Sequence, residues 1–151
     1  MHRYTVELRI LGKELDTAAV TNKLALQPSS TRQVGERRGK SAFWEEAMWG
    51  YDGFSEEATD RDWESLEDGL NFLLDRIATV NNAIREYKRG NTVILWCGHF
   101  QSSFDGGPVF SATLLKRLGD LGVEMFIDNY FSDEENNAAP NRTGTKQWST
   151  S

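Results

Sequence analysis

Residues 65–90, SLEDGLNFLLDRIATVNNAIREYKRG, carry the most regular pattern in the chain and decide its fold class. Apolar side chains recur three and four residues apart, which is the rhythm of a helix with one buried stripe: Leu66, Leu70, Leu73, Leu74, Ile77, Val80, Ile84 and Tyr87. Ser65 with Asp68 is a start signal of capping-box type, and Gly90 suits the position after the last turn. Gly69 costs about 1 kcal/mol relative to alanine in a helix. We predict one long amphipathic helix here.

Strands and shorter helices are predicted on both sides of this helix. Residues 4–10, YTVELRI, alternate apolar and polar side chains, which indicates a strand with one buried face. Asp16 is a good N-cap for a short helix that Pro28 stops. Residues 31–51 are interpreted as two strands around a turn, the second over 43–51. Further strands are expected over 92–100 and 123–130, with a capped helix over 111–121 between them.

The predicted order is β-α-β-β-α-β-α-β, in which the first six elements match the split β-α-β, or ferredoxin-like, arrangement. The fold class is therefore α+β, with a mainly antiparallel sheet, an added C-terminal helix and strand, and helices on one face. Residues 1–131 are expected to form one α+β domain. Residues 132–151 are poor in apolar side chains and are expected to be a disordered tail.

Composition excludes several classes of protein. The chain has 151 residues and a formal net charge of −6, with a single cysteine, Cys97, and two histidines. No intrachain disulfide and no cysteine zinc cluster can form, and no metal or cofactor is expected. The first residues lack a signal-peptide pattern and no apolar run is long enough to span a membrane, so a cytoplasmic protein with no membrane partner is expected.

A set of scattered residues resembles one protein family. These are Leu24-x-Leu26-x-Pro28, Gly35, Trp44, the strand 95–100, Gly107-x-Val109-Phe110, and Leu118-x-x-Leu121-Gly122 leading to Asp128-x-Tyr130. Together they resemble the bacterial family catalogued as domain of unknown function 4279, over about Tyr4 to Tyr130. The resemblance implies a small bacterial α+β domain and brings no activity with it. The acidic stretch between Trp49 and Trp63 is longer here than that family leads us to expect.

The last two predicted strands carry apolar side chains on both faces. Helices can cover only one face, so Trp96, Phe126 and Tyr130, with Trp44 beside them, are expected on the other as a binding surface. The alternatives are cover by the acidic loop or by a second copy of the chain. Such a face can stack nucleic-acid bases, but the net charge of −6 and the net −9 of residues 45–68 oppose phosphate binding.

Two polar groups are further candidates. Residues 31–40 carry a net charge of +3, and Arg37 and Arg38 could bind an anion or pair with the acids of residues 45–68. His99 is a candidate catalytic base with Asp105 and a loop serine, Ser102 or Ser103. Cys97 lies two residues from His99 along a strand, too far for a direct pair, and is interpreted as a core residue.

Three functions follow from these patterns. The first is a non-catalytic binding module, of the inhibitor or immunity type, that recognises a protein partner or itself through the aromatic sheet face. The second is a small enzyme around His99 and the 102–105 loop, with Arg37 or Arg38 orienting an anionic substrate. The third is a small-molecule sensor that uses the same sheet face as the floor of a pocket, which a pocket of several hundred Å³ would favour.

Overall fold

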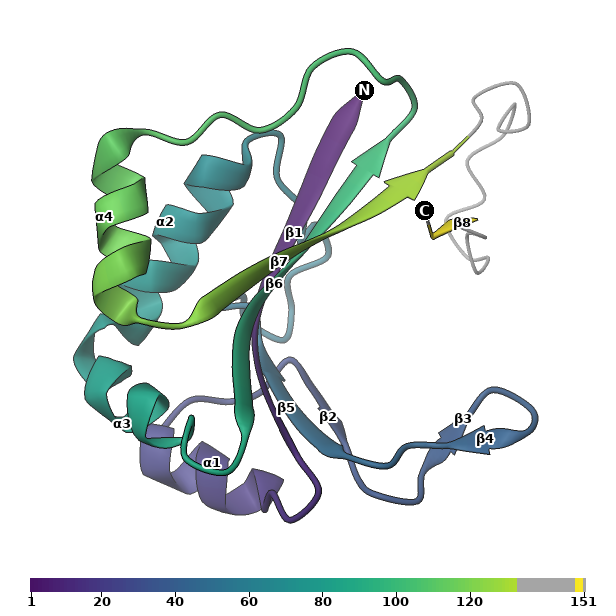
Figure 1. Cartoon of the computed structure of the whole chain (residues 1–151), viewed down its shortest axis with the longest axis vertical. Coiled ribbons are helices and arrows are strands. Elements are labelled where there is room, and N and C mark those ends of the chain that lie inside the picture. The colour runs from purple at the N-terminus through teal and green to yellow at the C-terminus, as the bar shows by residue number, and fades with distance from the viewer. Residues whose placement is uncertain (133–148, 151) are drawn as a thin grey trace.

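The strand predicted at the start of the chain is the centre of the sheet. The computed structural model describes residues 1–132 and 149–150 (Figure 1). Strand β1 (His2–Gly12) buries Tyr4, Val6, Leu8 and Ile10, while the residues between them stay half-buried on the opposite face. It pairs antiparallel with β5 (Ala47–Tyr51) on one side and with β6 (Thr92–Gln101) on the other. The alternating pattern is therefore confirmed as a strand with one core face.

The main sheet has the strand order β2-β5-β1-β6-β7-β8. Strand β2 (Ser30–Arg32) pairs antiparallel with β5, β7 (Glu124–Phe131) pairs parallel with β6, and β8 (Ser149–Thr150) pairs antiparallel with β7. Among the described strands only the β6–β7 pair is parallel, so the prediction of an α+β fold with a mainly antiparallel sheet is confirmed. The expected tail, residues 132–151, lies outside the described residues apart from Ser132 and β8.

The segment over residues 31–51 differs from the prediction of two strands. It forms four, because β3 (Arg37–Arg38) and β4 (Ala42–Phe43) lie between β2 and β5 as a separate two-stranded sheet. Gly35 and Gly39 have φ of 87° and 68°, a region that suits glycine and lets the chain turn before and after β3. Figure 1 shows this β3–β4 arm extending away from the main sheet on the side opposite the helices.

The long helix predicted over 65–90 is wrong in its length. It is divided into α2 (Leu66–Ile77), a 3₁₀ turn (Ala78–Val80) and α3 (Asn81–Glu86). The break falls at Thr79-Val80-Asn81-Asn82, where β-branched and Asn residues have poor helix propensity, and a 3₁₀ turn takes up the change. Its predicted start is confirmed, since the Ser65 side chain accepts a hydrogen bond from the Asp68 amide.

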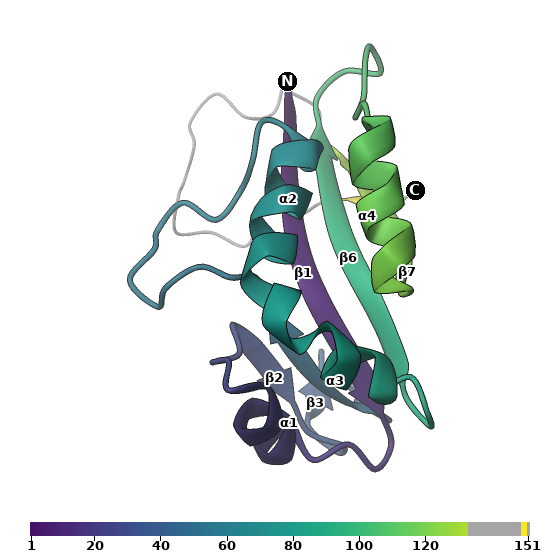
Figure 2. The same cartoon turned by 90° about the vertical axis from the view of Figure 1, so that its left-hand side faces the viewer.

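The two remaining helices begin where their caps were predicted. Helix α1 (Thr17–Leu24) is capped by Asp16, and α4 (Ala112–Leu121) is capped by Ser111. Figure 1 shows α1, α2, α3 and α4 on one side of the sheet, and Figure 2, seen from that side, shows α2 in front of β1 and α4 beside β6.

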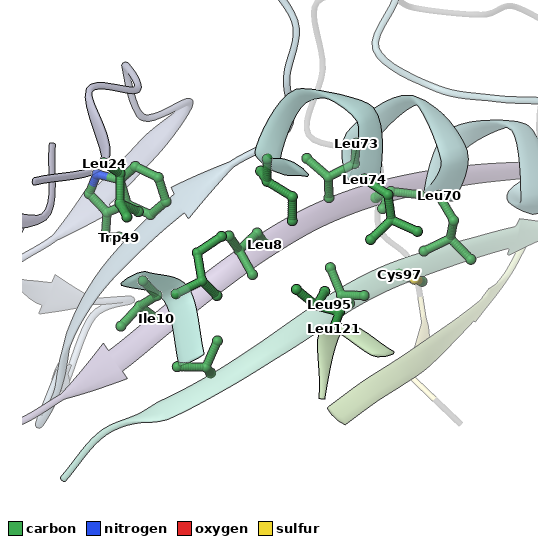
Figure 3. Close-up of a cluster of buried hydrophobic side chains, with 14 of the residues drawn as sticks. Leu8, Ile10, Leu24, Trp49, Leu70, Leu73, Leu74, Leu95, Cys97 and Leu121 are labelled. Atoms are coloured by element: carbon green, nitrogen blue, oxygen red, sulfur yellow. The ribbon is translucent and has the colours of Figure 1, made fainter. Parts of the chain in front are cut away.

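The core lies between these helices and the sheet. Leucines of α2 meet the buried side chains of β1 and β6, and Leu121 of α4 closes one side (Figure 3). Trp49 is fully buried between β5 and α1, where its indole N–H donates to the Thr21 hydroxyl at 3.0 Å. Burial of these side chains is the main force that holds the helices on this face.

Candidate functional site

The sheet face opposite the helices carries its own ordered set of side chains. Alternation along β1 directs the residues between its core positions to this side, and the strand register aligns them with β6 and β7. We call this surface the open face, and it comprises Arg3, Thr5, Glu7, Arg9, Trp96, Gly98, Phe100, Phe126, Asp128 and Tyr130. The predicted residues Trp96, Phe126 and Tyr130 therefore lie together on one surface.

Aromatic rings form two neighbouring pairs on the open face. The rings of Trp96 and Phe126 have centroids 4.8 Å apart, and those of Phe100 and Tyr130 stack at 4.9 Å. Phe126 remains 43% exposed, whereas Trp96 and Tyr130 are half-buried. Burial, together with a hydrogen bond from its hydroxyl to Asp128, raises the pKa of Tyr130 to about 12. The tyrosine is therefore neutral at physiological pH.

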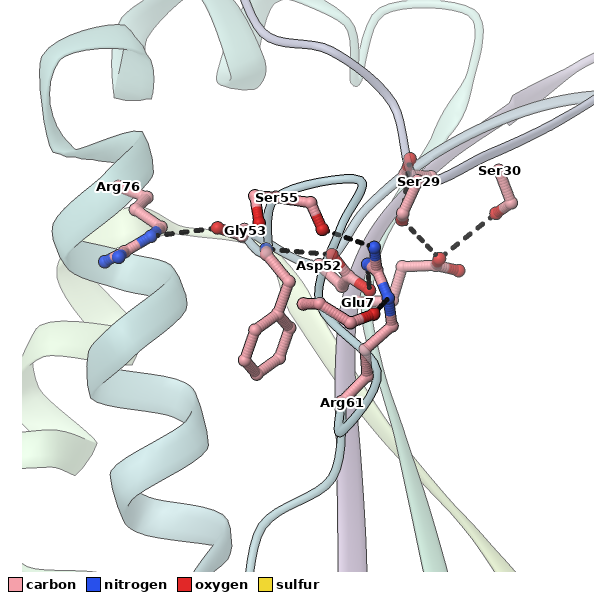
Figure 4. Close-up of polar contacts among 11 residues, drawn as sticks. Glu7, Ser29, Ser30, Asp52, Gly53, Ser55, Arg61 and Arg76 are labelled. Atoms are coloured by element: carbon pink, nitrogen blue, oxygen red, sulfur yellow. Dashed lines mark hydrogen bonds and ion pairs between the residues drawn. The ribbon is translucent and has the colours of Figure 1, made fainter. Parts of the chain in front are cut away.

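Arg9 is held in a fixed position beside Trp96. Its guanidinium carbon lies 4.3 Å from the centroid of the Trp96 ring, and its Nε donates to Glu7 Oε1 at 2.7 Å. The other oxygen of Glu7 accepts from the hydroxyls of Ser29 and Ser30 at 3.0 and 3.1 Å (Figure 4). Stacking and the charge-assisted hydrogen bond together fix the plane of the Arg9 guanidinium.

The Glu7 side chain reaches Ser29 and Ser30 because it passes over Gly50 of β5, which has no side chain. A Cβ atom on Gly50 would come within 2.8 Å of both the Glu7 carboxyl carbon and the Ser30 hydroxyl. The network around Glu7 therefore requires the bare backbone of β5 at this position.

The acidic loop after β5 contributes two charged residues to the open face. Arg61 donates from Nη1 to Asp52 at 2.7 Å, and from Nε and Nη2 to the carbonyls of Ala58 and Ser55 (Figure 4). The Asp52 carboxylate also accepts from the Phe54 amide at 3.0 Å. These bonds close the loop on itself at the edge of the sheet.

In the described part of the chain, the acidic residues after β5 form their ion pairs with Arg3 and Arg61 and not with the basic residues 31–40. Arg3 pairs with Asp62 and, at 3.3 Å, with Glu64. Within residues 1–132 and 149–150, Arg37 and Arg38 form no ion pair with those acids. Arg38 lies over the Trp44 ring at 4.8 Å, and Arg32 covers the same ring at 3.5 Å. Trp44 is therefore held at the base of the β3–β4 arm.

Two adjoining cavities open on this face and share Thr5 and Phe100. The first, about 270 Å³, is lined by open-face residues and by the loop residues Asp52 and Arg61. The second, about 280 Å³, continues toward Arg3, Asp62 and Ser102. Each is slightly smaller than a typical small-molecule site, and the two together lie within the range of about 300–1,000 Å³ in which proteins bind small molecules.

His99 lies on the other face of the sheet, at the end of the core. It is 5% exposed and its ring stacks on Tyr4 with centroids 4.7 Å apart. Its Nε2 lies 2.8 Å from Nδ1 of His2 and its Nδ1 lies 2.9 Å from Oδ1 of Asn129. Burial lowers the pKa of His99, and the nearby His2 lowers it further, against the effect of the Asn129 hydrogen bond.

The other residues of the proposed catalytic group are placed differently. Asp105 contributes its backbone carbonyl, 2.5 Å from His2 Nε2, rather than its carboxylate. The Ser102 hydroxyl accepts from the Met1 amino group at 3.0 Å, and Ser103 has no hydrogen bond to His99. The structure therefore does not bring a hydroxyl to His99. Sequence reasoning missed His2, although it and His99 are the only histidines and lie near paired strand ends.

Cys97 is fully buried among core residues. Burial raises the pKa of its thiol to about 12, so the thiolate is absent at neutral pH. Among the described residues no cluster of three or more histidine, cysteine or acidic side chains could hold a metal ion. No helix in the described part of the chain is long and apolar enough to cross a membrane.

Comparison with known proteins identifies a family but no characterised relative. No curated protein matches the chain, and no solved structure matches it. One family model covers residues 2–132, which is most of the chain and includes every strand and helix that the structure describes except β8. The protein therefore belongs to the family described as domain of unknown function 4279.

Proposed function

We propose that this protein is a non-catalytic binding module and that the open face is its binding site. The observation that carries the proposal is the pair of adjoining cavities over the sheet, with aromatic walls and a fixed arginine. Concave sites that combine apolar walls with a few oriented polar groups are the usual form of small-ligand sites. The occupant that best suits the two cavities is a small molecule.

A ferredoxin-like arrangement, extended by α4 and β7, is part of this proposal. The order β2-β5-β1-β6, with β1 antiparallel to both neighbours, supports it. In such a fold the helices leave one sheet face for a ligand.

Recognition of a protein partner or of a second copy is the second candidate. It is favoured by apolar side chains that remain in water near the open face. Phe126 is 43% exposed, and Phe43 and Val34 on or beside the β3–β4 arm are more than half exposed. Exposed apolar side chains that gather on one surface often mark an interface.

An enzyme centred on His99 has less support. Nucleophilic catalysis requires a base within hydrogen-bond reach of a hydroxyl or thiol. Both ring nitrogens of His99 are engaged, by His2 and Asn129, and the side chain is buried. A structural role for His99 accounts for these contacts.

A neutral fluorescent dye tests the binding proposal without involving charge. We expect Nile red to brighten with the wild-type protein and with Leu115→Ala, which removes an exposed apolar side chain on the helix side, but much less with Trp96→Ala. Circular dichroism verifies that each variant is folded. Equal brightening by all three proteins would contradict the proposal.

Sedimentation velocity separates the second candidate from the first. A dimer that Phe126→Asp dissociates, and Leu115→Asp does not, would identify the open face as an interface between copies. A monomer at all concentrations, together with dye binding that depends on Trp96, is the result we expect for a small-molecule site.

A further inference from the structure

We propose that the ligand of the open face is a small planar carboxylate, an aromatic acid with one ring, bound through the guanidinium of Arg9. This inference rests on the proposed function and names its ligand class. The ligand class is inferred by asking which polar groups around the cavity have donors or acceptors that are not yet hydrogen-bonded.

The acidic groups around the cavity are already occupied. The two oxygens of Glu7 accept from Arg9, Ser29 and Ser30. Those of Asp52 accept from Arg61 and from a backbone amide. The charges of Glu7 and Asp52 are thus already paired with Arg9 and Arg61, so the site does not need a cationic ligand to balance them.

Arg9 is the group with donors to spare. Its Nε is engaged by Glu7, but among residues 1–132 and 149–150 neither Nη atom has a hydrogen-bond partner. The three nitrogens of Arg61, in contrast, each donate to a loop acceptor. Arg9 lines the cavity, and the edge of its guanidinium that carries the two Nη atoms holds two parallel N–H groups, which is the geometry that a carboxylate accepts.

The walls of the cavity suit an aromatic ring. Trp96, Phe100 and Tyr130 line it, and the Phe100 ring and the Thr5 hydroxyl lie over the backbone of Gly98. Its volume is about 270 Å³, and a cavity of about 150 Å³ is enough for benzene. One ring with a carboxylate therefore fits this volume, with the carboxylate at Arg9 and the ring against the aromatic walls.

The charges of the open face favour a single negative charge over a polyanion. Glu7, Asp52 and Asp128 all lie on or beside the same surface, and their field opposes a phosphate chain. A carboxylate in the plane of Arg9 meets one guanidinium and needs no second cation. Single-stranded RNA is the competing ligand class that the test must distinguish.

Nuclear magnetic resonance titration with benzoate and benzamide tests the inference, since the two probes share a ring and differ in charge. We expect benzoate to shift the Trp96 indole signal with an affinity about tenfold or more above that of benzamide, because a charge-assisted pair is lost in the amide. Arg9→Gln should abolish the difference between the probes. Arg89→Gln, an exposed arginine beyond α3, should retain it.

A second variant at position 9 distinguishes loss of the ligand contact from loss of folding. Arg9→Lys keeps the charge without the planar fork, so it should bind benzoate between wild type and Arg9→Gln. Equal affinity for benzoate and benzamide would overturn the carboxylate inference while the open face remained a binding site. No shift with either probe would also overturn it, and the Nile red experiment then decides the proposed function by itself. Displacement of benzoate by oligouridine at lower concentration would replace the inference with RNA binding.

Discussion

His2 and His99 lie with Nδ1 of one 2.8 Å from Nε2 of the other, although 97 residues separate them in the sequence. The pair is part of a row that runs from the Asp105 carbonyl through both rings to Asn129. Two neutral imidazoles supply two N–H protons for the three contacts of this row. The third contact therefore needs a proton from another source. Either the Asn129 amide donates it to His99, or the histidine pair takes one from solution and becomes charged.

We expect acid to destabilise the protein through His99. Burial holds the pKa of His99 below its ordinary value of 6.5. The unfolded chain then binds a proton that the native His99 does not. The free energy of unfolding therefore falls as pH drops from above 6.5 to the lowered native pKa, and this group's effect is constant above 6.5.

Urea denaturation between about pH 7.5 and about pH 5 measures this slope. His99→Phe keeps a ring over Tyr4 but removes the titrating group, so its stability should change less over the same range. Equal slopes for the two proteins would show that other groups cause the whole dependence.

Replacing the partner of His99 should reverse the direction of its pKa shift. Asn129→Asp places a carboxylate where the amide oxygen now lies 2.9 Å from His99 Nδ1. An adjacent carboxylate favours the imidazolium, so the pKa of His99 should rise by about one unit or more. A titration of the imidazole carbon-bound proton signals measures the shift. An unchanged pKa would mean that Asn129 does not face His99 in solution.

Local sequence signals predicted the parts of the fold that depend on neighbouring residues. The alternation in β1, the caps at Asp16, Ser65 and Ser111, and the α+β class all follow from such signals and are confirmed. The break between α2 and α3 was missed because the apolar rhythm continues through Val80 and Ile84 even where helix propensity is poor.

Long-range relationships could not be predicted in the same way. The pairing of His2 with His99 depends on the register of β1 against β6, which no local pattern states. The contact of Arg9 with Trp96 depends on the same register. The aromatic residues of the open face were predicted from their alternation, but the arginine that lies between them and Glu7 was not.

The thiol of Cys97 should be unreactive in the native protein. It is fully buried and its pKa is raised to about 12, so both access and the thiolate are lacking. We expect N-ethylmaleimide to label the native chain only at the rate at which it unfolds, and the chain in urea at once. Mass spectrometry follows the single adduct, since the chain has one cysteine. Fast labelling without denaturant would contradict the buried position.

Two helical glycines should respond to alanine in opposite directions. Gly119 in α4 is exposed and a Cβ there meets nothing within 4 Å, so Gly119→Ala should raise the free energy of unfolding by up to about 1 kcal/mol. Gly69 in α2 is buried, and a Cβ there would come within 2.8 Å of Trp63 Cδ1 and 3.0 Å of Val6 Cγ2.

Trp63 cannot easily move away from an alanine at position 69. Its backbone amide and carbonyl are both bonded to Tyr4 of β1, at 2.7 and 2.8 Å. Overpacking should therefore exceed the gain in helix propensity, and Gly69→Ala should lower the free energy of unfolding by about 1–3 kcal/mol. Urea denaturation of both variants gives the comparison. If Gly69→Ala were as stabilising as Gly119→Ala, α2 would not approach β1 through Trp63 as closely as the structure has it.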